Sequence, residues 1–373
     1  MRRLRLLHTE SSCGWGGQEL RVLAESEGMM RRGHEVCIAS APESRLFAEA
    51  GRRGLRSVAL PIARKRLAGL NALRRFLGAN EFDIINTHSS TDAWLTALAR
   101  LTLRQAPPMV RTRHISALLP TNPLSTWIYR SASAQLVTTG ESLRRQLIDQ
   151  AGVAPERVTS VPTGLDLERF TPGDRLRARQ ELSLEQGAFY VAIVATLRSW
   201  KGHADLVDAI ASVPQAHLLI VGDGPGRDNL HRQVAQRQLE ARVLFAGHRE
   251  DVVPWMQAAD VIALPSFANE GVPQALMQAM ACGIPVITTL VGAIGEIVQD
   301  ERQGLIVPPR DVSALVLAIE RLEGSRALRD QLGQAGLAQA RERFSSERML
   351  EGMETVYARA LAPFPRVDGA VAR

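Results

Sequence analysis

The sequence predicts an α/β protein with two doubly wound parallel sheets, on three observations. Short runs rich in apolar and β-branched residues alternate with segments whose apolar residues recur at helical spacing. This alternation fills the first half of the chain and restarts after Tyr190. A length of 373 residues suits two domains, each with a core of its own. Because strands alternating with helices are typical of parallel sheets covered on both faces, we expect two Rossmann-like domains.

The first domain is expected over residues 1–168, with strands that end in polar or glycine-containing loops. The strand segments are 3–9, 34–40, 83–88, 108–114, 134–140 and 157–164. Segments between them, such as 17–33 and 91–104, carry apolar residues at helical spacing and are expected to be helices.

The second domain is expected over residues 169–345 and repeats the same pattern. Its strand segments are 190–197, 216–224, 242–247, 261–266, 284–289 and 304–309. Pro172 and Gly173 interrupt the polar stretch that joins the two domains. A last helical segment, 345–361, precedes a loosely patterned tail.

The composition excludes several classes of protein. Apolar residues make up 45% and charged residues 23%, which argues against disorder, collagen and coiled coil. Three cysteines are too few for a disulfide framework or a zinc site, so a reducing compartment is expected. The apolar part of the N-terminus is too short for a secretory signal, and no run of about 18 apolar residues could span a membrane. We therefore expect a cytoplasmic protein.

The net charge of +6 is unevenly distributed. Residues 1–170 hold 24 Lys and Arg against 15 Asp and Glu, and the remainder holds 21 against 24. Segment 51–80 has no acidic residue, and its cations include Arg64, Lys65 and Arg66. Leucines interleave with these cations, so the segment is either a solvated basic face or one that rests on an anionic membrane or glycolipid.

Ligands of open α/β sheets bind at the carboxyl ends of the strands, so the loops there hold the candidate site residues. Gly16 and Gly17 lead into the first helix, where backbone N–H groups could meet an anion; a plain turn is the alternative. His88 and His114 each follow a strand of the first domain and could donate a hydrogen bond or handle a proton.

In the second domain, Arg198 and Lys201 follow the first strand, where cations suit a diphosphate; a solvated surface pair is the alternative. Only two of the 45 basic residues are lysines, which makes Lys201 conspicuous. The later segment 265–289 places Glu270 and Gly271 before a helix expected to begin near Pro273. The glycines of 222–226 do not have GxGxxG spacing and give no support to hydride chemistry.

In their order along the chain, these motifs resemble the retaining glycosyltransferases of family 4, which have the GT-B fold. The matching stretches are GGQE (16–19), VPTGLDLERF (161–170), VATLRSWKGH (194–203), LLIVGDGP (218–225), NEGVPQALMQAMACGIPVITT (269–289), VGAIGEIV (291–298) and GLIVPPRD (304–311). The resemblance covers most of the chain. It implies two Rossmann-like domains facing a central cleft, with residues 346–373 crossing back onto the first domain.

The resemblance also implies the substrates. The second domain would hold a nucleotide-diphosphate sugar, with Arg198 and Lys201 neutralising the diphosphate and Glu270 holding hydroxyls of the transferred sugar. His114 matches a histidine that faces this sugar. The first domain would hold the acceptor, and its glycine pair at 16–17 would approach the diphosphate. No cofactor and no metal are expected.

Three positions depart from the family pattern. The second glutamate of the usual pair, which receives the ribose hydroxyls, is here Gln278, which lacks the charge. The usual arginine two residues before Arg198 is Thr196, and the usual asparagine of the joint is Thr163. Donor affinity and the choice of nucleotide therefore stay open.

The predicted activity is transfer of a sugar, with retention, to a glycan or glycolipid acceptor such as a lipopolysaccharide core. His88 and residues 64–66 are expected on the acceptor side, and peripheral attachment to the cytoplasmic face of the inner membrane is a hypothesis. A nucleotide-sugar epimerase is the alternative enzyme. A basic nucleic-acid-binding protein is the alternative of another class, but aromatic residues total only 5% and no recognition motif appears.

Overall fold

A computed structural model, described here for residues 2–114, 126–268 and 270–362, confirms the two parallel α/β domains. The first contains a seven-stranded sheet in the order β3-β2-β1-β4-β5-β6-β7, with every pair parallel. Its strands are β1 (Arg5–Glu10), β2 (Glu35–Ser40), β3 (Arg56–Ala59), β4 (Ile84–Thr87), β5 (Met109–Arg113), β6 (Gln135–Thr138) and β7 (Val158–Ser160).

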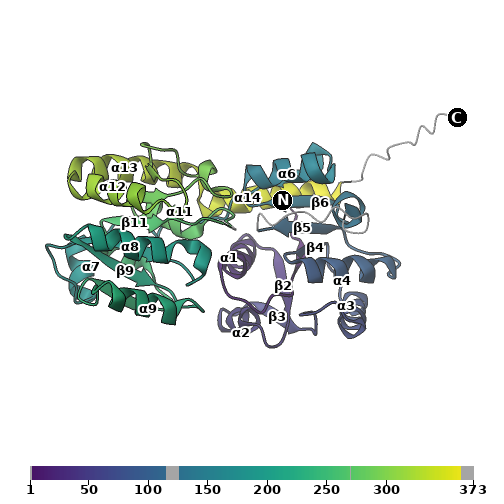
Figure 1. Cartoon of the computed structure of the whole chain (residues 1–373). Coiled ribbons are helices and arrows are strands. Elements are labelled where there is room, and N and C mark those ends of the chain that lie inside the picture. The colour runs from purple at the N-terminus through teal and green to yellow at the C-terminus, as the bar shows by residue number, and fades with distance from the viewer. Residues whose placement is uncertain (1, 115–125, 269, 363–373) are drawn as a thin grey trace.

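The helices of this domain connect successive strands (Figure 1). They are α1 (Gly17–Arg31), α2 (Arg45–Arg52), α3 (Leu67–Ala79), α4 (Ser90–Leu101), α6 (Glu141–Ala151) and the short η1 (Ile128–Ala132) and η2 (Pro155–Arg157). Ser89 and Asp92 form a capping box at the start of α4, which satisfies backbone N–H groups that a helix leaves unpaired. This capping box fixes the loop between β4 and α4, which contains His88 of the predicted site.

The second domain contains a six-stranded parallel sheet in the order β10-β9-β8-β11-β12-β13. The strands are β8 (Phe189–Val194), β9 (Ala216–Val221), β10 (Val243–Gly247), β11 (Val261–Leu264), β12 (Val286–Thr288) and β13 (Gly304–Ile306). The helices are α7 (Arg175–Glu181), η3 (Ser199–Lys201), α8 (His203–Ser212), α9 (Arg227–Gln236), α10 (Val253–Ala258), α11 (Gln274–Ala281), η4 (Ile294–Glu296), α12 (Val312–Glu323) and α13 (Arg326–Arg343).

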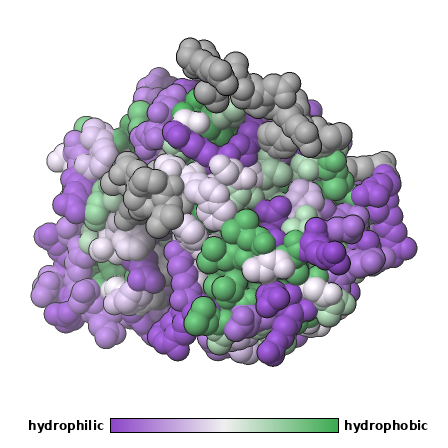
Figure 2. Space-filling model, turned by 90° about the vertical axis from the view of Figure 1, so that its right-hand side faces the viewer, coloured by the Kyte–Doolittle hydropathy of each residue, from purple (hydrophilic) through white to green (hydrophobic). Residues whose placement is uncertain are grey.

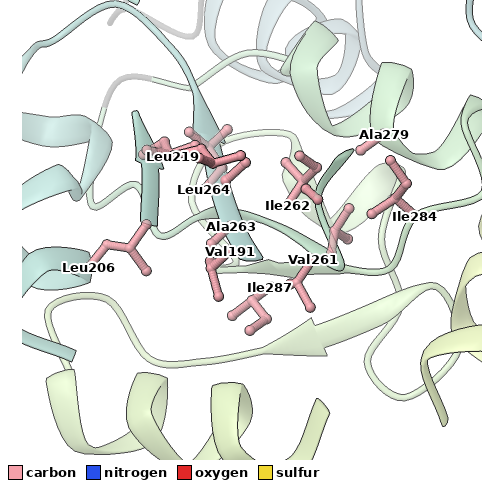
Figure 3. Packing of buried hydrophobic residues seen from close by; sticks show 14 of the residues in the cluster. Val191, Leu206, Leu219, Val261, Ile262, Ala263, Leu264, Ala279, Ile284 and Ile287 are labelled. Carbon is pink, nitrogen blue, oxygen red and sulfur yellow. The ribbon is translucent and has the colours of Figure 1, made fainter. Parts of the chain in front are cut away.

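The core of the second domain lies on both faces of its sheet. Figure 3 shows Val191, Val261 and Ile287 of the strands packing with residues such as Leu206 of α8 and Ala279 of α11. All five are fully buried. This explains why the strand segments read as continuous apolar runs, since a parallel sheet covered on both sides has no solvent face.

The last helix, α14 (Ser346–Leu361), packs on the first domain and not on the second. Met349, Met353 and Tyr357 lie in a buried cluster with Leu6 of β1 and Val110 of β5. Figure 1 shows the yellow helix α14 running along the upper side of the first domain, next to α6 and β6. The chain therefore passes between the domains twice, although the domain boundaries drawn from the sequence stay predictions.

The two passages lie side by side. Leu165 donates its N–H to the Phe344 carbonyl at 2.7 Å and accepts from the Ser346 N–H at 2.9 Å. A Cβ on Gly164 would lie 2.6 Å from Ser346 Cα, so only glycine allows this approach.

Candidate active site between the two sheets

The carboxyl ends of the two sheets meet through direct contacts between the domains. The Gln274 side chain at the start of α11 donates to the Gly17 carbonyl at 2.8 Å. A Cβ on Gly271 would lie only 2.7 Å from the His114 carbonyl oxygen. The structure thus brings predicted residues of both domains together: the glycine pair before α1 and the end of β5 face the loop after β11.

Lys201 and Glu270 form an ion pair at this interface. The Lys201 Nζ lies 2.6 Å from Glu270 Oε1, which also accepts a hydrogen bond from Ser266 Oγ at 2.6 Å. Glu270 is 3% exposed, whereas the Lys201 side chain is 21% exposed. The carboxylate is therefore held inside the protein, and the ammonium group has donors left for an anion.

Two glycines allow the backbone to close around this pair. Gly202 has φ +78°, and a Cβ there would lie 2.2 Å from the Pro265 carbonyl, so the loop carrying Lys201 rests directly on the loop after β11. Gly292 has φ +64°, and its Cβ would lie 2.0 Å from the Glu270 carbonyl. Larger residues would push both loops away from the ion pair.

Arg198 lies on the same loop as Lys201 but is exposed, with its guanidinium 5.7 Å from the centroid of the Trp200 ring. The glycines of 222–226 pack beneath this loop: a Cβ on Gly222 would lie 2.0 Å from the Ala195 carbonyl. These glycines therefore support the loop, which favours their structural interpretation.

Gln278 is half-buried on α11, one turn beyond Gln274.

The two predicted histidines belong to a chain of three. His88 Nδ1 lies 3.0 Å from His114 Nε2, and His88 Nε2 lies 2.9 Å from Nδ1 of His8 in β1. Burial lowers the pKa of each of the three rings, so they are neutral near pH 7. His88 is 4% exposed, and its two ring nitrogens are hydrogen-bonded to His8 and His114. His114 is partly buried and is the least buried of the three.

A pair of buried carboxyl groups next to these histidines was not predicted from the sequence. Asp92 accepts from the Thr9 hydroxyl at 2.8 Å, and Glu10 accepts from the Ser12 N–H at 2.7 Å. Burial and the neighbouring Asp92 raise the pKa of Glu10 to about 8, and burial raises that of Asp92 to about 6. The signal that could have found Glu10 is its position as the last residue of β1, at the carboxyl edge.

The predicted acceptor-side cations lie before α3 in the first domain. Arg64, Lys65 and Arg66 are exposed, and the Lys65 Nζ lies 5.5 Å from the centroid of the Trp94 ring in α4. Burial and the nearby Arg111 lower the pKa of Lys65. A cation above an aromatic ring on this face of the first domain offers contacts for an anionic or sugar-bearing ligand.

Within the described residues, no group of three His, Cys, Asp or Glu side chains is arranged to hold a metal ion. In the same part of the chain, no helix has the length and apolar character to cross a bilayer. The absence of a metal from the reaction stays a prediction.

Two family comparisons match the chain, one to each domain. The family described as Glycosyltransferase Family 4 matches residues 15–169, and that described as Glycosyl transferases group 1 matches residues 174–339. The chain belongs to the family 4 glycosyltransferases. The resemblance expected from the sequence motifs is thereby confirmed, and with it the GT-B fold.

This family 4 glycosyltransferase has relatives of known name and of known structure. It is 30% identical to a D-inositol 3-phosphate glycosyltransferase of Stackebrandtia nassauensis, over 69% of this chain and 64% of that protein, so the match spans just under two thirds of that relative. A glycosyltransferase of Rickettsia africae has a TM-score of 0.86 at 18% identity, covering 98% and 100% of the two chains. Anabaena HepE, solved in complex with UDP-glucose, has a TM-score of 0.83 at 22% identity, covering 95% and 100%.

Proposed function

We propose that this glycosyltransferase moves a hexose from a nucleotide-diphosphate sugar to a glycan or glycolipid acceptor, with retention at the anomeric carbon and without a metal. The observation that carries the proposal is the ion pair between the half-buried Lys201 and the buried Glu270, which lies where the carboxyl ends of the two sheets meet. A cation and a carboxylate at one point suit a donor whose diphosphate is anionic and whose sugar offers hydroxyl groups.

The donor would be bound mainly by the second domain. The diphosphate takes Lys201 as a partner, Arg198 turns from Trp200 toward it, and the backbone N–H groups near Gly16 and Gly17 approach from the first domain. Glu270 then accepts hydrogen bonds from sugar hydroxyls while Ser266 continues to hold it. Gln278 would contact the ribose through its amide, and UDP-glucose, which HepE binds, is the first donor to test.

The reaction breaks the bond between the anomeric carbon and the leaving phosphate oxygen, and forms a bond from that carbon to the acceptor oxygen. The acceptor hydroxyl gives its proton to the departing phosphate oxygen on the same face of the sugar. Charge develops on the leaving diphosphate, so Lys201 and Arg198 stabilise the transition state more than the ground state. Exclusion of water by the facing domains limits hydrolysis of the donor.

The acceptor side carries a surface suited to a lipid-linked substrate. Leu67, the first residue of α3, is 76% exposed, and Arg64, Lys65 and Arg66 directly precede it. Figure 2, which looks at this side of the molecule, shows hydrophobic surface bordered by hydrophilic surface. Apolar side chains next to cations suit the cytoplasmic face of an anionic membrane. We propose peripheral attachment there and an envelope glycolipid, such as a lipopolysaccharide core, as acceptor.

Sedimentation with lipid vesicles tests the attachment. The protein should bind vesicles containing anionic lipid at low salt and should not bind zwitterionic vesicles. Leu67→Ser with Arg64→Glu should weaken this binding, whereas Leu317→Ser, which changes an exposed leucine of the second domain, should not. Failure to bind anionic vesicles at low salt, or equal binding by both variants, would refute the attachment.

Proton NMR of the reaction tests the proposed activity. Incubation with a nucleotide sugar and a lipopolysaccharide-core acceptor should give a product whose anomeric configuration matches the donor, and activity should persist in EDTA. An inverted product, or loss of activity in EDTA, would contradict the mechanism. Rapid conversion of the donor sugar without any acceptor would instead identify an epimerase.

A further inference from the structure

The chain of three histidines continues inward to a buried carboxylate. His8 Nε2, at the inner end, lies 4.0 Å from Glu25 Oε1 of α1. The same oxygen accepts a hydrogen bond from the Tyr357 hydroxyl of α14 at 2.6 Å, and Asn86 Nδ2 of β4 lies 3.4 Å away. His8, Glu25 and Tyr357 are fully buried. The row of histidines therefore runs from the protein interior to the partly buried His114 at the interface between the domains.

Neutral imidazole has one N–H and one lone pair, so the three rings have only two consistent arrangements. In one arrangement, all three protons are on Nε2: His114 donates to His88, His88 donates to His8, and His8 points its N–H toward Glu25. In the other, all three are on Nδ1 and every hydrogen bond is reversed. The nitrogen of His8 that carries the proton therefore determines which nitrogen of His114 carries one.

The groups around His8 favour the first arrangement. Glu25 offers a carboxylate oxygen within 4.0 Å of His8 Nε2, which attracts an N–H and repels a lone pair. Arg21 faces the other carboxylate oxygen, with its Nε 3.7 Å from Glu25 Oε2. Tyr357 holds the carboxylate in place through its hydroxyl.

We propose that His8, His88 and Glu25 are positioning residues that fix the tautomer of His114, so that its Nδ1 presents a lone pair at the site. This inference rests on the proposed function for its consequence: His114 accepts a hydrogen bond from a substrate hydroxyl instead of donating one. It also gives His88 a role on the acceptor side that acts through His114. A histidine at a site is commonly oriented by the partner of its other nitrogen.

NMR of protein labelled with ¹⁵N-histidine tests the tautomer without any substrate. Multiple-bond ¹H–¹⁵N spectra distinguish an unprotonated ring nitrogen from an N–H, and the His114→Gln variant assigns the signals by their loss. The expected result at pH 7 is an unprotonated Nδ1 and a protonated Nε2 on His114. The proposal is overturned if Nδ1 of His114 carries a proton, either in place of the proton on Nε2 or in addition to it.

Two substitutions at the inner end provide the functional readout. His8→Leu removes the acceptor for the His88 N–H, whereas His8→Asn keeps an oxygen near the position of Nδ1. With UDP-glucose as donor, kcat should fall by about 10-fold or more in His8→Leu and recover in His8→Asn, with a similar donor KM. Equal loss in both variants would contradict the proposal. If the wild type transfers sugar from no member of a panel of nucleotide sugars, the proposed function fails, and the tautomer spectrum still decides this inference.

Discussion

At the scale of single residues, the site depends on charges that are held inside the protein. The buried Glu270 carboxylate is stabilised by Lys201 and by the Ser266 hydroxyl, each at 2.6 Å. A buried carboxylate is costly to leave without any partner, since its charge would have neither a counter-ion nor water. Under the proposed function, Lys201 would bind the anionic donor while the Ser266 hydroxyl continues to donate to Glu270.

Glu270→Gln should lower transfer by about 100-fold or more while leaving the fold intact. The amide keeps the shape of the side chain but cannot offer two anionic oxygens to sugar hydroxyls. Initial rates and the melting temperature check this expectation together. Glu301→Gln, on the exposed surface of the same domain, is the matched control. Wild-type rates in Glu270→Gln would remove this residue from the site.

Stability should fall as pH rises from about 4.5 to about 8 because of Glu10. Its pKa is raised from 4.5 to about 8 on folding, so in this range the folded protein binds more protons than the unfolded chain. The free energy of unfolding therefore decreases as the pH rises through this range. Glu10→Gln removes this group, and its melting temperature should drop less between pH 5 and pH 9.

Thermal unfolding at the two pH values, with the exposed Glu240→Gln as control, measures the contribution of Glu10. The control should show the wild-type pH dependence. The same dependence in Glu10→Gln would mean that this carboxyl is ionised in the folded protein throughout the range.

At the scale of elements, the sequence predicted the strands that have continuous apolar runs and missed one that does not. β3 has four residues, RSVA, of which none is fully buried. An edge strand of this length has no hydrophobic pattern to detect. The histidine chain was missed for a different reason: His8 and His88 meet because β1 pairs with β4, and strand order is a property of the fold. Periodicity along one strand contains no information about its neighbour.

The loop around Gly292 provides a prediction at this scale. Gly292→Ala should reduce donor-dependent turnover at least about tenfold, since its Cβ would lie 2.0 Å from the Glu270 carbonyl and displace the loop. Gly247→Ala is a matched control: its φ is +72° against +64°, and no atom lies within 4 Å of the added Cβ. The control should lose only about 1–2 kcal/mol of stability from the left-handed backbone. Equal turnover in both variants would show that the contact is unimportant.

At the scale of the whole molecule, two kinds of contact hold the domains together. The paired crossing at Leu165 and Ser345 connects them covalently, and α14 completes the first domain with residues from the end of the chain. On the side of the site, the Glu296 carboxylate of the second domain accepts from the Glu141 and Ser142 N–H groups at the start of α6, at 2.5 and 2.6 Å. A carboxylate at a helix N-terminus is a favourable contact.

Removing this carboxylate should let the domains separate. Glu296→Ala should increase the radius of gyration measured by small-angle X-ray scattering, since it leaves two N–H groups of α6 without their partner, a loss of about 1 kcal/mol. Glu301→Ala should leave the radius unchanged. An unchanged radius in Glu296→Ala would show that other contacts suffice to hold the domains in this arrangement.

We propose that Lys201 binds the diphosphate of a nucleotide sugar. Thermal unfolding in the presence of a panel of nucleotide sugars tests it most directly, because a ligand at about 100 times its Kd adds about 2.7 kcal/mol to the free energy of unfolding. At least one donor should raise the melting temperature of the wild type and raise that of Lys201→Met clearly less. If no nucleotide sugar stabilises the protein, or if the same donor stabilises both proteins equally, the claim is wrong.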